Sequence, residues 1–201
     1  MNKLLTYISY LFHPLFMSFI GVGLFYTFTA KFYEIDYIES RLFQLFILTI
    51  IIPLLLFRIL KKLDIVSSLM MTDVKERRYP YAIAIILNLY ITVFIFESVA
   101  EPELHYFFAG ISFTAISFFI LSLLNYKASL HAAAIAGLTL FIAAISLHYQ
   151  TNMVGIIGIL LLCNGLVATS RLHLKAHTVQ ELILGFFMGT IPQFMLLIYW
   201  V

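Results

Sequence analysis

Charged residues are scarce in this chain. Lysine, arginine, aspartate and glutamate make up 11% of its 201 residues, against 63% hydrophobic residues, whereas soluble domains typically carry about 25% charged residues. This composition excludes an ordinary soluble domain. The mean hydropathy of +1.02 points the same way, and the sequence therefore predicts an integral membrane protein.

Cysteine and blocks of positive charge are also scarce. Cys163 is the single cysteine and lies in an apolar run, which excludes an internal disulfide and a multi-cysteine metal cluster. The net charge is only +2 and no block of five or more lysines and arginines occurs, so we expect no nucleic-acid partner. No polar stretch approaches the roughly 50 residues of a soluble domain, and residues 1–201 are expected to form a single integral membrane domain.

Long apolar runs make up most of the sequence. About seven runs approach the ~20 residues that a helix needs to cross a bilayer: 4–29, 42–60, 80–98, 104–124, 130–148, 153–169 and 180–200. Stretches such as Leu45–Phe57 are uniformly apolar, without the alternation of a membrane β-barrel. The sequence thus predicts an all-α polytopic transmembrane helical bundle of six to seven spans, the first a retained span rather than a cleaved signal peptide. We expect kinks at the prolines within spans, which are Pro14, Pro53 and Pro192.

The loops between spans divide into two sets, one on each side of the membrane. One set holds the N-terminus, 61–79, 125–129 and 170–179, and the other holds 30–41, 99–103 and 149–152. The first set carries nine lysines and arginines, whereas the second carries Lys31 and Arg41. By the positive-inside rule the first set is cytoplasmic, and we expect this orientation in a bacterial cytoplasmic (inner) membrane.

Three polar clusters lie in the first set of loops and therefore return to one membrane face. They are Arg77–Pro80, Lys127–His131 and Ser170–Glu181. Several cations, a serine hydroxyl and the helix start near Ser129 suit an anion with several oxygens, and phosphate is the natural candidate. His177 and Glu181 stand four residues apart and share a helix face. Glu181 is thus placed to hold one ring nitrogen of His177, which leaves the other as a nucleophile or base.

The last cluster resembles the third motif of the type 2 phosphatidic acid phosphatases, a family of membrane lipid phosphatases. That motif reads Ser-Arg, five residues, His, three residues, Asp. Here Ser170, Arg171, His177 and Glu181 keep this spacing, with glutamate in place of aspartate. The resemblance extends over residues 75–189 and predicts a lipid phosphatase.

The other two motifs of the family match less completely. The second, Pro-Ser-Gly-His, is represented by Ala128–His131, which agrees at the serine and the histidine. The first, Lys, six residues, Arg-Pro, departs most, because no lysine stands seven residues before Arg78 and a tyrosine separates Arg78 from the proline. Lys75 or Lys127 would then replace the family's lysine. The segment Leu184–Gly189 resembles the glycine-containing continuation of the third motif.

The resemblance implies hydrolysis of a lipid phosphomonoester or diphosphate through a phosphohistidine, without a metal or another cofactor. His177 is the implied nucleophile, Glu181 orients it, and His131 protonates the leaving oxygen. The implied phosphate-binding residues are Arg171, Ser129, Arg78, Ser170, Lys127 and Lys75. Phosphatidic acid, phosphatidylglycerophosphate and polyprenyl diphosphate all suit such a site, so the expected partners are a lipid phosphate substrate and membrane lipids.

Other interpretations of the same residues stay open on the sequence. A lipid phosphotransferase would use the same phosphohistidine and pass the phosphoryl group to an alcohol. His173, His177 and Glu181 form an i, i+4, i+8 row that would ligate zinc in a metal-dependent intramembrane hydrolase. A non-catalytic lipid-binding or transport protein would use the polar residues only to bind its lipid.

We interpret the histidines and acidic residues outside the three clusters as structural rather than catalytic. We interpret His13 as a satisfied histidine of the bundle, because no carboxylate near it in sequence would pair with it. We expect solvated or interfacial positions for the residues grouped on the opposite face: Glu97, Glu101, Glu103, His105 and His148.

Overall fold

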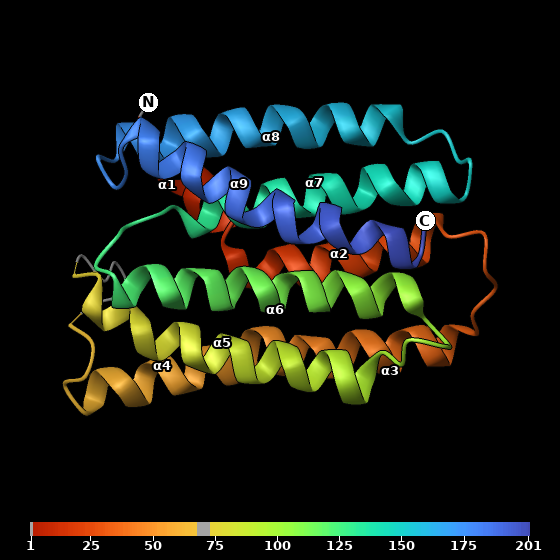
Figure 1. Ribbon diagram of the computed structural model, residues 1–201, viewed down its shortest axis with the longest axis horizontal. Coiled ribbons are helices and arrows are strands. Elements are labelled where there is room, and N and C mark those ends of the chain that lie inside the picture. Colours follow the sequence, from red (N-terminus) through yellow and green to blue (C-terminus); the bar gives the residue numbers. More distant parts are fainter. Residues whose placement is uncertain (1, 68–72) are drawn as a thin grey trace.

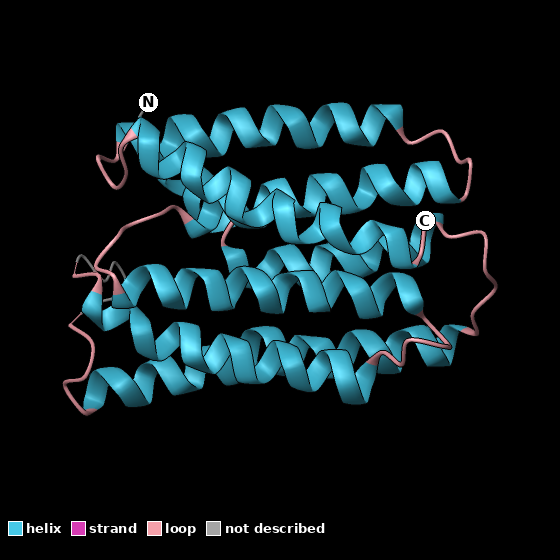
Figure 2. Ribbon diagram, viewed as in Figure 1, coloured by secondary structure: helices cyan, strands magenta, loops and turns pink. Residues whose placement is uncertain are grey.

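The computed structural model describes residues 2–67 and 73–201, and all the regular structure within them is helical. Residues 68–72 of the predicted 61–79 loop lie outside the described residues. Long helices run side by side between two ends where the loops gather (Figures 1 and 2). Six helical stretches of the described chain are long and apolar enough to cross a membrane, which confirms the predicted all-α transmembrane bundle.

The observed helices follow the predicted spans closely from residue 80 onward. The first half holds α1 (Asn2–Leu11), α2 (Pro14–Phe28), and α3 (Ile35–Phe46), which continues through the π-helical segment η1 (Ile47–Ile51) into α4 (Ile52–Lys62). The 3₁₀ turn η2 (Lys75–Arg77) leads into α5 (Arg78–Tyr90) and the π-helical segment η3 (Ile91–Ile95). The last helices are α6 (Pro102–Leu123), α7 (Leu130–His148), α8 (Val154–His173), α9 (Val179–Leu196) and the 3₁₀ turn η4 (Leu197–Tyr199).

Two predicted loop boundaries are wrong, whereas the kink predicted at Pro14 is confirmed. Within the predicted 4–29 span, α1 and α2 meet at a bend of 58°. His13 is extended between them, and Pro14 begins α2 because a proline suits a first turn, where no N–H is needed. The predicted loop 30–41 is helical from Ile35. The predicted loop 170–179 begins later, because α8 continues to His173.

Pro53 lies just after a widened turn of its helix. The backbone N–H of Ile52 donates five residues back to the carbonyl of Ile47, as in a π-helix. Such a turn is a common way for a helix to absorb a proline or a bend. Pro192 lies inside α9, and the kinks predicted at these two prolines stay predictions.

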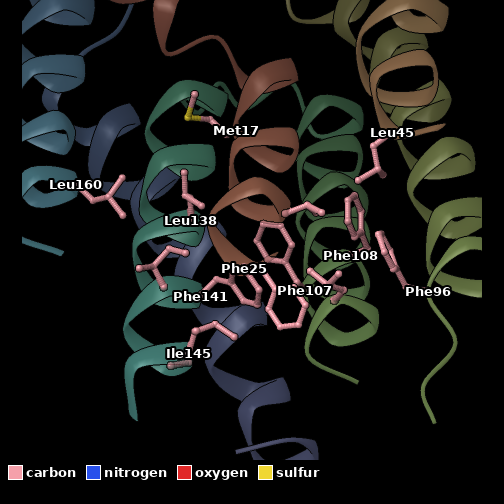
Figure 3. Packing of buried hydrophobic residues seen from close by; sticks show 14 of the residues in the cluster. Met17, Phe25, Leu45, Phe96, Phe107, Phe108, Leu138, Phe141, Ile145 and Leu160 are labelled. Carbon is pink, nitrogen blue, oxygen red and sulfur yellow. The ribbon is translucent and has the colours of Figure 1, made fainter. Parts of the chain in front are cut away.

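Aromatic side chains fill the centre of the bundle (Figure 3). Phe107 of α6 stacks on Phe141 of α7 with 4.1 Å between ring centroids, and Phe25 of α2 is fully buried beside them. Because lipid tails are as apolar as these rings, close packing rather than exclusion of water holds the helices together. The shared core fixes α7, the helix that carries the second polar cluster, against α2 and α6.

Helices α7 and α9 approach each other through glycine. A Cβ atom built on Gly189 would lie 2.7 Å from the Cα of Ala133, and one built on Gly185 would lie 3.0 Å from the backbone nitrogen of Ser129. Small residues allow such close approach of membrane helices. This contact sets the N-terminal end of α9 directly against that of α7.

The segments that carry the three polar clusters meet at one end of the bundle, as the alternation of spans predicts. The N-terminus, the 124–129 loop, the 174–178 loop and η2 all lie at the left end in Figure 1. The loops 29–34, 96–101 and 149–153 lie at the other end.

Glu101 and Glu103, at that other end, were expected at solvated or interfacial positions, and they are not solvated, since each is only 1% exposed. Glu101 accepts two tyrosine hydroxyl hydrogen bonds of 2.7 Å, and Glu103 pairs with a lysine ammonium at 2.8 Å and accepts a further tyrosine hydroxyl. The donors are Tyr26, Tyr37, Lys31 and Tyr149. Buried carboxylates need such partners, and these come from distant segments that the sequence pattern does not connect.

Candidate functional site

His177 and Glu181 form a closely held pair at the start of α9. Nδ1 of His177 lies 2.6 Å from Oε2 of Glu181. Thr178 caps α9 in a capping box: its hydroxyl accepts the Glu181 N–H at 3.3 Å, and its own N–H donates to the Glu181 carboxylate at 3.4 Å. The helix start therefore holds the carboxylate, and the carboxylate holds the imidazole. With Nδ1–H donated to Glu181, the lone pair of the neutral ring is on Nε2.

The surroundings of His177 keep its ring neutral. Its side chain is 4% exposed. Burial lowers the pKa of His177 to about 4, the hydrogen bond with Glu181 opposes this, and the charges of Arg171 and Lys127 add to the lowering. The imidazole is therefore uncharged above pH about 4, which is the state that a nucleophile or a base requires.

An open pocket of about 270 Å³ lies against this pair. It is lined by Lys127, Leu172, Lys175, Ala176, His177, Thr178 and Glu181. Nζ of Lys127 donates to the Ala176 carbonyl at 2.8 Å and lies 3.8 Å from Oε2 of Glu181. Two lysines beside a neutral histidine favour an anionic ligand in this pocket.

Ser129 joins the second cluster to the third. Its side chain is fully buried, its hydroxyl caps α7 by accepting the N–H of Ala132 at 3.4 Å, and its own N–H donates to the Glu181 carbonyl at 3.0 Å. The start of α7, whose N–H groups favour anions, is thus anchored beside the start of α9. The predicted proximity of these two clusters is what the structure shows.

Ser170, Arg171 and His131 lie together on the side of the site that faces α1. The hydroxyl of Ser170 donates to the Leu5 carbonyl at 2.6 Å, and Nη1 of Arg171 donates to the Ser9 hydroxyl at 2.6 Å. Nε2 of His131 lies 3.2 Å from the Ser9 carbonyl oxygen. The charge of Arg171 acts on both His131 and His177, so these residues belong to one cluster.

His13 is a satisfied histidine of the bundle, as expected, and it also lies beside the second polar cluster. Its ring packs edge-on against that of His131, with 5.2 Å between centroids, and its Nδ1 accepts the N–H of Leu15 at 3.4 Å. One feature of the sequence could have indicated the special position of His13. It directly precedes Pro14, and this His-Pro pair interrupts the helix of the first span. Only the 58° bend at that pair brings His13 to α7.

The segment predicted to hold the first motif is arranged differently from the prediction. The guanidinium of Arg78 donates to the Ser122 carbonyl at 3.2 and 3.3 Å and to Asn125 at 3.4 Å, so Arg78 caps the end of α6. Lys75 is exposed in η2. Arg77, which sequence reasoning did not choose, is the residue of this segment whose charge acts on Arg171.

The zinc-binding row considered from the sequence does not form. Within residues 2–67 and 73–201, no three His, Cys, Asp or Glu side chains are grouped so that they could hold a metal ion. The row required one continuous helix, whereas α8 ends at His173 and α9 begins at Val179. His177 therefore lies in the connection and turns its Nδ1 to Glu181.

Comparisons of the chain with protein-family models, with curated proteins and with solved structures found no match. The chemistry of the site therefore rests on its residues and their geometry.

Proposed function

We propose that the protein is a membrane lipid phosphatase that hydrolyses a lipid phosphomonoester or diphosphate through a phosphohistidine on His177. The observation that carries this proposal is the 2.6 Å contact between His177 Nδ1 and Glu181 Oε2, beside a pocket with two lysines. A buried neutral imidazole, an orienting carboxylate and fixed cations are the parts that metal-free phosphoryl transfer needs. The motif resemblance in residues 75–189 supports the same reaction.

In the first step, the Nε2 lone pair of His177 attacks phosphorus, a P–N bond forms, and the P–O bond to the lipid breaks. Glu181 stabilises the positive charge that develops on the imidazole. His131 gives a proton to the leaving lipid oxygen. In the second step water attacks the phosphohistidine and gives a proton to His131, and inorganic phosphate leaves with the P–N bond broken.

The remaining polar residues of the site stabilise the charge on the phosphoryl oxygens. Arg171, Ser170 and Lys127 hold phosphoryl oxygens, on which charge shifts in the transition state. Nε of Arg171 is buried without a hydrogen-bond partner among the described residues. Because a guanidinium matches phosphate oxygens in a bidentate fork, that unused donor supports a phosphate ligand.

A lipid, rather than a soluble phosphate ester, is supported by an apolar groove next to the site. The groove has a volume of about 270 Å³ and is lined by Ala132, Asn164, Ala168, Leu182, Ile183, Phe186 and Phe187. Ala132 follows His131 and Leu182 follows Glu181, so the groove is lined by the same helices, α7 and α9, that carry these two reacting residues. The phosphate would reach the cations while a hydrocarbon chain stays in apolar surroundings.

The lysine and arginine bias supports a cytoplasmic orientation of this face in a bacterial inner membrane. Lys61 is exposed at the end of α4. A cysteine at this position, in a Cys163→Ala background, should resist a membrane-impermeant thiol reagent in intact cells and react after the cells are opened. Reaction in intact cells would reverse the orientation and leave the proposed chemistry intact.

The direct test uses purified protein in detergent with phosphatidic acid, phosphatidylglycerophosphate and polyprenyl diphosphate. We expect release of inorganic phosphate from at least one of them, inhibition by vanadate, which mimics the transition state, and full activity in excess chelator. Release of phosphate measured by colorimetry checks the reaction. Absence of release from every lipid, or complete loss of activity in chelator, would rule out the metal-free phosphatase.

The pH dependence follows from the state of His177. Its pKa is lowered to about 4, so the neutral, nucleophilic form persists as pH falls from 8 to 5 and is lost only as pH passes through about 4. We expect the rate of phosphohistidine formation, measured in single-turnover quench experiments, not to fall through loss of the neutral His177 as pH is lowered from 7 to 5. A fall of that rate centred near the ordinary histidine value of about 6.5 would mean that the nucleophile is a solvated histidine.

A further inference from the structure

Three donors of the proposed phosphate site point to oxygens of one helix, α1. Arg171 donates to the Ser9 hydroxyl and Ser170 to the Leu5 carbonyl, each at 2.6 Å, and His131 Nε2 lies 3.2 Å from the Ser9 carbonyl. The three donors are an arginine, a serine and a histidine, the groups that would hold and protonate phosphate oxygens. Helix α1 therefore supplies neutral oxygens where the proposed substrate would supply charged ones.

The contact with α1 satisfies this cluster only in part. Ser9 and Leu5 are 8% and 9% exposed, so the contact is closed to solvent, yet Nε of Arg171 has no partner among the described residues. A partly buried guanidinium whose buried Nε has no partner and which has one neutral acceptor among the described residues is poorly compensated. Phosphate offers charge-assisted, bidentate hydrogen bonds, which are about twice as strong as neutral ones, and would therefore compete well against Ser9 for Arg171.

The outer face of α1 is exposed, whereas its inner face packs on α8. The large hydrophobic residues exposed on that face are Leu4, Tyr7, Tyr10 and Leu11. Aromatic and aliphatic side chains of this kind suit the boundary between lipid and water. The helix is joined to α2 through the extended His13 and Pro14 at a 58° bend, which offers a hinge between the two.

We propose that α1 is a lid over the phosphate site, held shut by the oxygens of Ser9 and Leu5. The substrate phosphate opens the lid by taking over Arg171, Ser170 and His131. This inference rests on the proposed function, because it requires an anion to bind this cluster. Since the lid and the anion compete for the same donors, whatever weakens the closed lid strengthens anion binding by the same factor.

Thiol labelling measures the opening of the lid independently of catalysis. In a Cys163→Ala background, Leu5→Cys places a thiol on the buried face of α1, and Leu4→Cys places one on the exposed face as a matched control. We expect saturating vanadate to speed maleimide labelling at position 5 by about fivefold or more, as typical couplings do, and to leave position 4 unchanged. Equal rates at position 5 with and without vanadate would overturn the lid.

Substitution of Ser9 tests the competition for Arg171. Ser9→Ala removes the hydroxyl that Arg171 contacts, and Tyr10→Phe removes a hydroxyl from the exposed face of the same helix as the control. We expect Ser9→Ala to lower the vanadate concentration for half-maximal binding by about tenfold, as loss of one hydrogen bond to a charged group allows, and Tyr10→Phe to leave it unchanged. Weaker vanadate binding by Ser9→Ala would instead make Ser9 part of the phosphate site and overturn the lid.

The same experiments separate the two proposals. Vanadate binding is followed by the shift in melting temperature of the wild-type protein. Binding without faster labelling at position 5 overturns the lid and leaves the phosphatase standing. No vanadate binding at all overturns both.

Discussion

Replacing His177 with alanine is expected to lower kcat for phosphate release by a factor of ~10⁴–10⁶, the loss typical of removing an enzyme's nucleophile. The physical reason is that no P–N bond can form, so water would have to attack the lipid phosphate directly. Release of phosphate from the best lipid in the detergent assay measures the loss. Quenching the wild-type reaction with labelled substrate should trap an acid-labile, base-stable phosphoprotein that His177→Ala lacks.

The matched control is His173→Ala. His173 ends α8, four residues before His177, and is exposed. Its replacement should change activity by no more than about twofold, as usual for an exposed position. If His177→Ala kept its activity, or if the trapped phosphoryl group were on another residue, the proposed mechanism would be wrong.

Replacing Gly189 with alanine is expected to destabilise the protein by about 3 kcal/mol or more, at the upper end of the cost of overpacking. The added Cβ would lie 2.7 Å from the Cα of Ala133 on α7. Because the obstacle is backbone, no side chain can turn aside, and α9 must move away from α7. That movement would also displace Glu181 from Ser129, so activity should fall together with stability. The melting temperature in detergent measures the effect.

The control for this change is Gly165→Ala on α8. A Cβ at Gly165 would meet nothing within 4 Å, and alanine has a helix propensity about 1 kcal/mol better than glycine. We expect Gly165→Ala to keep or raise the melting temperature and to retain activity. A melting temperature for Gly189→Ala equal to that of the wild type would contradict the close packing of α7 on α9.

Features that depend on neighbouring residues were predictable. The later spans agree with the helices to within a few residues, because the bilayer imposes a length and a composition that can be read directly. The contact between His177 and Glu181 follows from their i, i+4 spacing near a helix start. Thr178, three residues before Glu181, is the sequence sign of a capping box, although sequence reasoning did not use it.

Features that depend on distant segments were not predictable. Ser9 and His131 are 122 positions apart and meet only because α1 bends away from α2 and packs on α8. Sequence reasoning chose Arg78, whereas the structure uses it to cap α6 and brings the charge of Arg77 to Arg171. The burial of Glu101 was not predicted, because the tyrosines that bury it belong to other segments.

The sequence by itself determined that this protein is a helical membrane bundle and that the polar run from Ser170 to Glu181 shares a membrane face with two other clusters. Both follow from local rules, namely span length, charge placement and residue spacing. Only the tertiary structure decided that the run is divided between two helices, which removes the zinc-binding row and places Glu181 on α9 and Arg171 and Ser170 on α8. It also decided that α1 covers those last two residues, because contacts between distant helices arise from packing that no local pattern encodes.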